Sequence, residues 1–262
     1  MEVIDRGSGP VLVLIPGLQG RWEYLRPAVR ALSASFRVLT FSLDDVVRLK
    51  PDTTADLNGY ARHVAALMDQ ASVETATICG VSFGGLIAVR FAAQYPAKCA
   101  ALILASTPQP KLRLSPRHQI YLRAPWIFGP LFLVETPFRL RPEILAAIPD
   151  ARARRRFSMR QLKTAITAPV SLSRIAARAR MISTEDVTPD CARIIAPTLV
   201  VTGERHLDHV VPVEGSAEYL QLISGSRAAV LARTGHLGTI TRPDTFAALA
   251  RAFTEGLRHA AA

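Results

Sequence analysis

The sequence predicts an α/β fold, a mostly parallel and doubly wound sheet, because strand-like and helix-like segments alternate along most of its 262 residues. A second observation is a Gly-x-Ser-x-Gly turn between one such strand and the next helix. A third is the interval 107–189, which has helical patterns but no clear strand. The chain therefore divides into residues 1–106 and 190–262, which build the sheet, and a helical insertion between them.

Apolar runs bounded by glycine and proline predict the strands. We expect strands near residues 10–16, 37–42, 75–81, 99–105, 197–203 and 227–233. Helical periodicity predicts helices near residues 22–34, 54–71, 83–95, 213–223 and 241–257, and within the insertion over 152–165 and 172–181. Proline after Tyr95 ends the helix that follows the serine turn.

The serine turn reads Gly80-Val81-Ser82-Phe83-Gly84. A serine between two glycines at a strand–helix junction requires a sharp turn with small neighbours, which lifts its hydroxyl out of the sheet edge. A glycine-rich junction without chemistry is the ordinary alternative. Because a predicted strand precedes the turn and a predicted helix follows it, we interpret Ser82 as a candidate nucleophile.

A serine needs a base to take its proton and a third group to orient that base. His236 follows a strand-like stretch and precedes a helix that begins near Pro243. A loop in that place can carry the imidazole back over the sheet edge. A lone histidine is usually structural, but His236 stands where a serine–acid–histidine order requires it, so it is the candidate base.

The acid is expected between them, after another strand. Asp208 follows the strand 197–203 and stands four residues before Pro212, which opens the next helix. A buried carboxylate there would hold the imidazole in one tautomer and stabilise its protonated form. Glu204, in the same loop, is the alternative acid.

A metal site is a further interpretation of this loop, since His206, Asp208 and His209 are all possible ligands. No matching cluster occurs elsewhere in the sequence. We therefore expect neither a metal nor a cofactor.

Together these segments resemble the α/β-hydrolase superfamily, over about residues 8–106 and 190–257. The likeness is carried by the turn 80–85, the histidine loop 234–243 and the stretch 13–20 at the end of the first predicted strand. It implies a helical cap over the active site, formed by residues 107–189. It also implies an oxyanion hole made by the backbone N–H groups of Leu18 and Phe83.

Three departures from the family pattern stand out. Pro16 occupies a place where many members carry histidine, and the loop from Gly203 to Asp208 is longer than usual. After residues 37–41 the chain lacks the glycine-rich turn that many members have there. The longer loop affects the assignment of the acid most.

Positive charge is concentrated in the insertion. The formal net charge is +11, and residues 111–180 alone hold 15 Lys and Arg against 3 Asp and Glu. The clusters are Arg152, Arg154, Arg155, Arg156, Arg160 and Lys163, and then Arg174, Arg178 and Arg180. One interpretation is electrostatic attraction of an anionic partner, which would be an anionic or carrier-linked substrate or an anionic lipid surface. The ordinary alternative is a helix face exposed to solvent. No aromatic residues interleave with them, so we expect no nucleic-acid partner.

The stretch 120–134 is apolar and aromatic but interrupted by proline. We expect it to pack the cap onto the core, with one or two of Trp126, Phe128 and Phe132 facing the substrate pocket. No run approaches the ~20 apolar residues of a membrane-spanning helix. The N-terminus lacks a signal-peptide pattern, and the three cysteines suit buried positions in a reducing compartment, so a cytoplasmic location is expected.

We therefore expect a serine hydrolase of a carboxylic ester that works through an acyl-enzyme. Ser82 would attack, His236 would act as base and then as acid, and Asp208 would orient it. The resemblance also implies lactones, thioesters or C–C bonds as alternative targets of the same triad. A homologue that only binds a small ligand is the alternative from another class.

Overall fold

The computed structural model describes residues 3–44, 56–112 and 138–261. A seven-stranded sheet in the order β1-β3-β2-β4-β5-β6-β7 lies at the centre. β1 is antiparallel to β3, and each of the other pairs is parallel. The strands are β1 Val3–Arg6, β2 Val11–Ile15, β3 Arg37–Phe41, β4 Ala76–Val81, β5 Cys99–Ala105, β6 Thr198–Thr202 and β7 Arg227–Val230.

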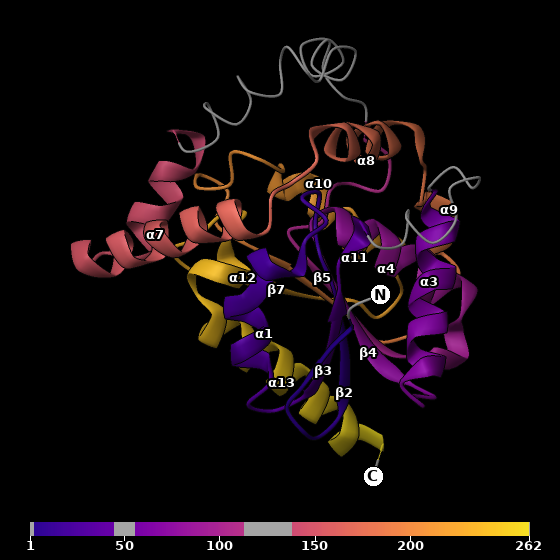
Figure 1. Ribbon diagram of the computed structural model, residues 1–262. Coiled ribbons are helices and arrows are strands. Elements are labelled where there is room, and N and C mark those ends of the chain that lie inside the picture. Colours follow the sequence, from indigo (N-terminus) through magenta and orange to yellow (C-terminus); the bar gives the residue numbers. More distant parts are fainter. Residues whose placement is uncertain (1–2, 45–55, 113–137, 262) are drawn as a thin grey trace.

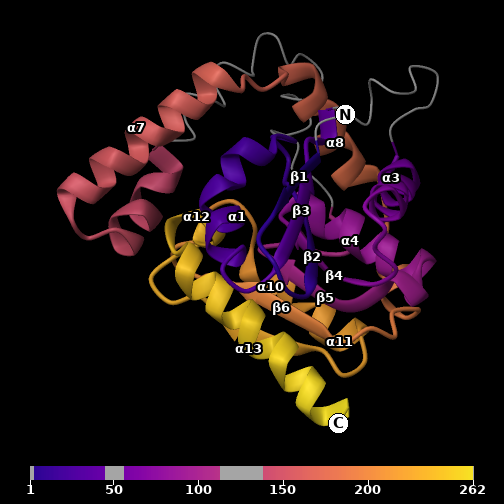
Figure 2. The same ribbon diagram turned by 60° about the horizontal axis from the view of Figure 1, so that its bottom comes forward.

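Helices cover both faces of the sheet (Figures 1 and 2). Those of the sheet-building part are α1 Arg26–Leu32, α3 Leu57–Gln70, α4 Phe83–Gln94, α10 Val213–Ala217, α11 Tyr219–Leu222, α12 Gly238–Thr241 and α13 Pro243–Ala261, with short 3₁₀ turns η1 Trp22–Leu25 and η2 Pro96–Lys98. Between β5 and β6 come a helical stretch over residues 138–147, α7 Ala151–Thr167, α8 Leu172–Thr184 and α9 Thr188–Cys191. The predicted fold class is therefore confirmed.

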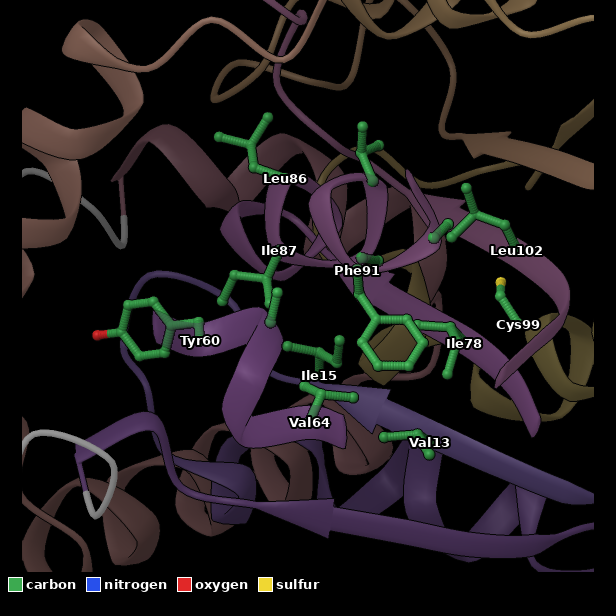
Figure 3. Close-up of a cluster of buried hydrophobic side chains, with 14 of the residues drawn as sticks. Val13, Ile15, Tyr60, Val64, Ile78, Leu86, Ile87, Phe91, Cys99 and Leu102 are labelled. Atoms are coloured by element: carbon green, nitrogen blue, oxygen red, sulfur yellow. The ribbon is translucent and has the colours of Figure 1, made fainter. Parts of the chain in front are cut away.

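Alternate residues of the central strands face two separate apolar clusters. Val13 and Ile15 of β2 point toward α3 and α4, where they meet Tyr60, Val64 and Ile87 (Figure 3). Their neighbours in β2 point to the opposite face, toward η1, α1 and α13. Because β2 is buried on both faces, its sequence is a continuous apolar run instead of an alternating one.

The parallel strands bring their carboxyl ends to one edge of the sheet, where the connecting loops gather. α8 packs against α4, and α7 packs against η1. In both overall views α7 extends beyond the outline of the sheet and its flanking helices (Figures 1 and 2). No helix in the described ranges combines the length and the apolar character needed to cross a bilayer.

Two local features differ from expectation. β1 was not predicted, and the predicted helix 213–223 consists of two short helices, α10 and α11, separated by Glu218.

Cys79, Cys99 and Cys191 are buried and free, and burial raises the pKa of each thiol to about 12. Such thiols stay protonated and serve as small apolar groups.

Candidate active site

Ser82 occupies the sharp turn between β4 and α4. Its backbone angles, φ 53° and ψ −124°, lie in a region that side-chain-bearing residues rarely adopt. Hydrogen bonds hold it there, because its N–H donates to the carbonyl of Ala105 and its own carbonyl accepts from Gly85, both at 2.8 Å. The flanking glycines are required by space: an added Cβ at Gly80 would overlap the carbonyl of Gly84. Strain maintained in this way, about 1–3 kcal/mol, is typical of functional positions.

His236 lies in the loop between β7 and α12, and its Nε2 is 3.1 Å from Ser82 Oγ. The loop reaches Ser82 by packing tightly on the loop after β6. An added Cβ at Gly235 would overlap the carbonyl of Leu207, and one at Gly203 would overlap the carbonyl of Thr234. Glycine at these two positions therefore allows the histidine loop and the acidic loop to touch.

Asp208 lies in that second loop with its side chain 2% exposed. Its Oδ2 is 3.6 Å from His236 Nδ1, an ion-pair distance that is longer than a hydrogen bond. Its Oδ1 accepts from the N–H groups of Val210 and Val211 at 3.0 and 2.9 Å. Burial alone would raise the pKa of Asp208, but the contact with His236 and the two N–H groups outweigh it and lower that pKa. The carboxylate is therefore kept charged beside the imidazole.

The alternative acid, Glu204, has other contacts. Its Oε1 accepts from the N–H of Arg233 at 2.8 Å, and its Oε2 is 3.6 Å from Nε2 of His206. Within the described ranges, no group of three or more His, Cys, Asp or Glu side chains is arranged to hold a metal ion. The structure thus brings Ser82, His236 and Asp208 together from three separate strand ends.

The expected oxyanion loop lies beside the serine. An added Cβ at Gly17 would come 3.2 Å from Ser82 Cβ, so Leu18, the next residue, is adjacent to the turn. Phe83 is the first residue of α4, and the N–H groups of a first helical turn have no partner within the helix. Both backbone donors are therefore candidates to bind a developing negative charge.

Arg178, on α8, supports this loop from the insertion. Its Nη1 donates to the carbonyl of Leu18 at 3.0 Å, its Nη2 pairs with Asp44, and its side chain is 2% exposed. Arg178 was expected among the cations that face solvent or capture a substrate, and it is buried instead. The neighbouring basic residues of α7 are exposed, apart from half-buried Arg154.

Glu143, in the helical stretch 138–147, is a further residue of the site and was not predicted from the sequence. This glutamate is 0% exposed and accepts hydrogen bonds from Thr234 and Leu237, which lie on either side of His236 in the chain. The predicted pocket residues Trp126, Phe128 and Phe132 lie outside the described residues.

A family model described as the alpha/beta hydrolase fold matches residues 10–243. This chain belongs to the alpha/beta hydrolase fold family. Among solved structures, the alpha/beta hydrolase chain resembles the enol-lactonase from Burkholderia xenovorans LB400 with a TM-score of 0.77 at 22% identity, covering 97% of this chain and 96% of that one. This likeness shows the shared fold.

Two curated relatives extend the comparison. The polyketide synthase ThaQ of Burkholderia thailandensis is 28% identical over 267 residues, covering 99% of this alpha/beta hydrolase chain but only 12% of the synthase. The putative carbamate hydrolase RutD of Escherichia coli is 24% identical over 254 residues, covering 92% of this chain and 90% of RutD. The chain thus matches one small part of a large protein and nearly all of a small one.

Proposed function

We propose that this protein is a serine hydrolase that cleaves a carboxylic ester through an acyl-enzyme intermediate. The 3.1 Å contact between Ser82 Oγ and His236 Nε2, which joins residues far apart in the chain, carries the proposal. The strained backbone at Ser82 supports it, because a serine that only filled space would not need it. A neighbouring base is what turns a weakly nucleophilic hydroxyl into a reactive one.

In the proposed reaction, Ser82 Oγ attacks the acyl carbon while His236 Nε2 takes the hydroxyl proton. The negative charge on the carbonyl oxygen is held by the N–H groups of Leu18 and Phe83. His236 then gives the proton to the departing alcohol, which leaves the acyl group on Ser82. A water molecule, deprotonated by His236, releases the acid and restores the serine, while Asp208 stabilises the imidazolium in both halves.

As part of this proposal, residues 107–189 form a cap over a core made of residues 1–106 and 190–262. The contacts of Arg178 and Glu143 with the loops around Ser82 support that division, because both come from the insertion. The relatives suggest a broad test panel. An enol-lactonase and a putative carbamate hydrolase are among these relatives, and lactones and carbamates contain an acyl carbon bonded to oxygen as esters do.

Labelling with a fluorophosphonate probe tests the chemistry directly. We expect one probe per chain, attached at Ser82, and no attachment in Ser82→Ala. Activity should then follow on a panel of short esters, lactones and carbamates. A wild-type chain that neither takes up the probe nor hydrolyses any member of the panel would contradict the proposal and favour a protein that only binds a ligand.

A carrier-linked thioester is the second candidate substrate. The excess of positive charge in residues 111–180 and the full-length match to one part of a polyketide synthase favour it. If the exposed cations of α7 attract such a substrate, kcat/KM for an anionic or carrier-linked substrate should fall with salt while that for a neutral ester barely changes. An equal response of both substrates to salt would argue against it.

A further inference from the structure

Glu143 connects the insertion to the loop that carries His236. Its Oε1 accepts a hydrogen bond from the hydroxyl of Thr234 at 2.8 Å and another from the N–H of Leu237 at 2.5 Å. These donors flank His236 in sequence. One carboxylate oxygen, held by a helix of the insertion, therefore fixes the chain on both sides of the imidazole.

The charge of Glu143 is placed where it destabilises the fold. The residue is 0% exposed, and burial raises its pKa, although hydrogen bonds from Thr234 and Leu237 and the charge of His236 act against this. Its second oxygen, Oε2, is buried and has no hydrogen-bond partner within the described residues. An uncharged side chain could seat the same loop without desolvating a carboxylate. A costly charge kept beside a reactive group indicates a role in the reaction.

We propose that Glu143 is a positioning residue of the site, which holds the His236 loop from the insertion and whose carboxylate supports the imidazolium formed during the reaction. This inference rests on the serine hydrolase chemistry proposed above. Asp208 meets Nδ1 of His236 at 3.6 Å, so a second carboxylate near the same loop adds to the field that stabilises the positive charge.

Few other charges bear on this pair within the described part of the chain. His236 is the titratable group whose charge affects the pKa of Glu143. Asp208, in the loop after β6, is the titratable group that interacts with His236 from the other side. Arg139, one turn before Glu143 in the same helical stretch, donates instead to the carbonyl of His209. Changes at Glu143 should therefore be felt mainly at His236.

Two substitutions separate the hydrogen bonds of Glu143 from its charge. Glu143→Gln keeps an oxygen that can accept from Thr234 and Leu237 but removes the negative charge, whereas Glu143→Ala removes both. Glu204→Gln is the matched control, because Glu204 also accepts a backbone N–H just before the histidine loop, from Arg233. The readouts are steady-state kinetics and the pH dependence of the rate at which the fluorophosphonate labels Ser82.

We expect Glu143→Ala to lower kcat by about 10- to 100-fold with little change in KM, because a displaced base affects the reaction more than binding. Glu143→Gln should lower kcat less than Glu143→Ala does. Its labelling rate should, however, show an acid limb shifted to lower pH by about 0.5 unit or more, because the imidazolium has lost a nearby negative charge. Glu204→Gln should leave both the acid limb and kcat close to wild type.

The inference is overturned if Glu143→Gln and Glu204→Gln share one acid limb and Glu143→Ala keeps the wild-type kcat. A lower melting temperature alone, with both readouts unchanged, would also overturn it, since that is the result of a purely structural role. An NMR titration of the His236 ring, assigned with a His236→Asn variant, gives a readout without turnover. If the wild-type protein does not label but the Glu143→Gln variant shifts the titration of His236, the proposed function is contradicted. The action of Glu143 on His236 is then still supported.

Discussion

Arg178 on α8 donates a hydrogen bond to the carbonyl oxygen of Leu18 at 3.0 Å, so the insertion holds the loop that lies beside the serine turn. The same guanidinium pairs with Asp44 beyond β3 and lies against Gly20, where an added Cβ would overlap it. The position of the loop proposed to hold the oxyanion therefore depends on a buried cation from a distant part of the chain.

Replacing this cation should damage both stability and activity, for different reasons. Arg178→Met leaves the buried Asp44 carboxylate only the longer ion pair with Arg174, at 3.5 Å. We expect a loss of about 3 kcal/mol in the free energy of unfolding, measured by urea denaturation. The double variant Arg178→Met/Asp44→Asn should recover much of that stability. It should not recover kcat, because the carbonyl of Leu18 still lacks its donor. Full recovery of kcat in the double variant would contradict this role.

Removing the charge of either carboxylate should show whether Asp208 or Glu204 is the acid of the proposed triad. Asp208→Asn removes the negative charge beside His236 Nδ1, and we expect kcat to fall by about 10⁴-fold. Glu204→Gln, in the same loop, should change kcat little. The two variants are compared by ester hydrolysis at neutral pH, and a larger loss in Glu204→Gln would reverse the assignment.

A methyl group at Gly235 should separate the two loops that meet at the site. Gly235→Ala would force the new Cβ into the carbonyl of Leu207, and we expect stability to fall by about 1–3 kcal/mol and kcat by about 10²-fold. Gly256→Ala, in α13, is the control because nothing lies within 4 Å of its added Cβ. That variant should be slightly more stable than wild type, since alanine favours a helix. Equal behaviour of the two variants would show that the loops do not constrain each other.

The raised pKa of Glu143 predicts how its replacement affects stability at different pH values. The usual pKa of a glutamate is 4.5, and burial in the folded state raises it. Ionisation of this carboxyl therefore opposes folding once the pH exceeds the usual pKa, and it has no effect at pH values well below it. The melting temperature of Glu143→Gln should therefore gain on that of wild type as the pH rises from about 4 to 8. Melting curves across that range test this, and a difference that is the same at every pH would contradict the stated cause.

Local patterns in the sequence were enough to predict the serine turn and the order of the three side chains. Ser82 is recognisable because its constraint, two glycines between a strand and a helix, lies within five consecutive residues. His236 and Asp208 could be placed because each follows a predicted strand, and the ends of parallel strands share one edge of the sheet. β1 escaped prediction because it is a four-residue edge strand that is only half-buried at best.

The supports of the site depend on tertiary structure that no local pattern reveals. Glu143 is the one acidic residue of the stretch 138–147, and its burial comes from the packing of that stretch against the histidine loop. Arg178 did carry a signal, because it shares a helix face with the apolar residues Met181 and Ile182, three and four positions later. Its position among other arginines obscured that signal.

The proposed reacting groups and the residues that support them belong to different parts of the chain. Ser82, Asp208 and His236 stand on loops of the sheet, while Arg178 and Glu143 arrive from the segment between β5 and β6. Grafting the corresponding segment of another family member onto this scaffold would therefore remove both of these supports at once. A chimera of that kind should fold yet turn over slowly until an arginine and a glutamate are restored at the equivalent points.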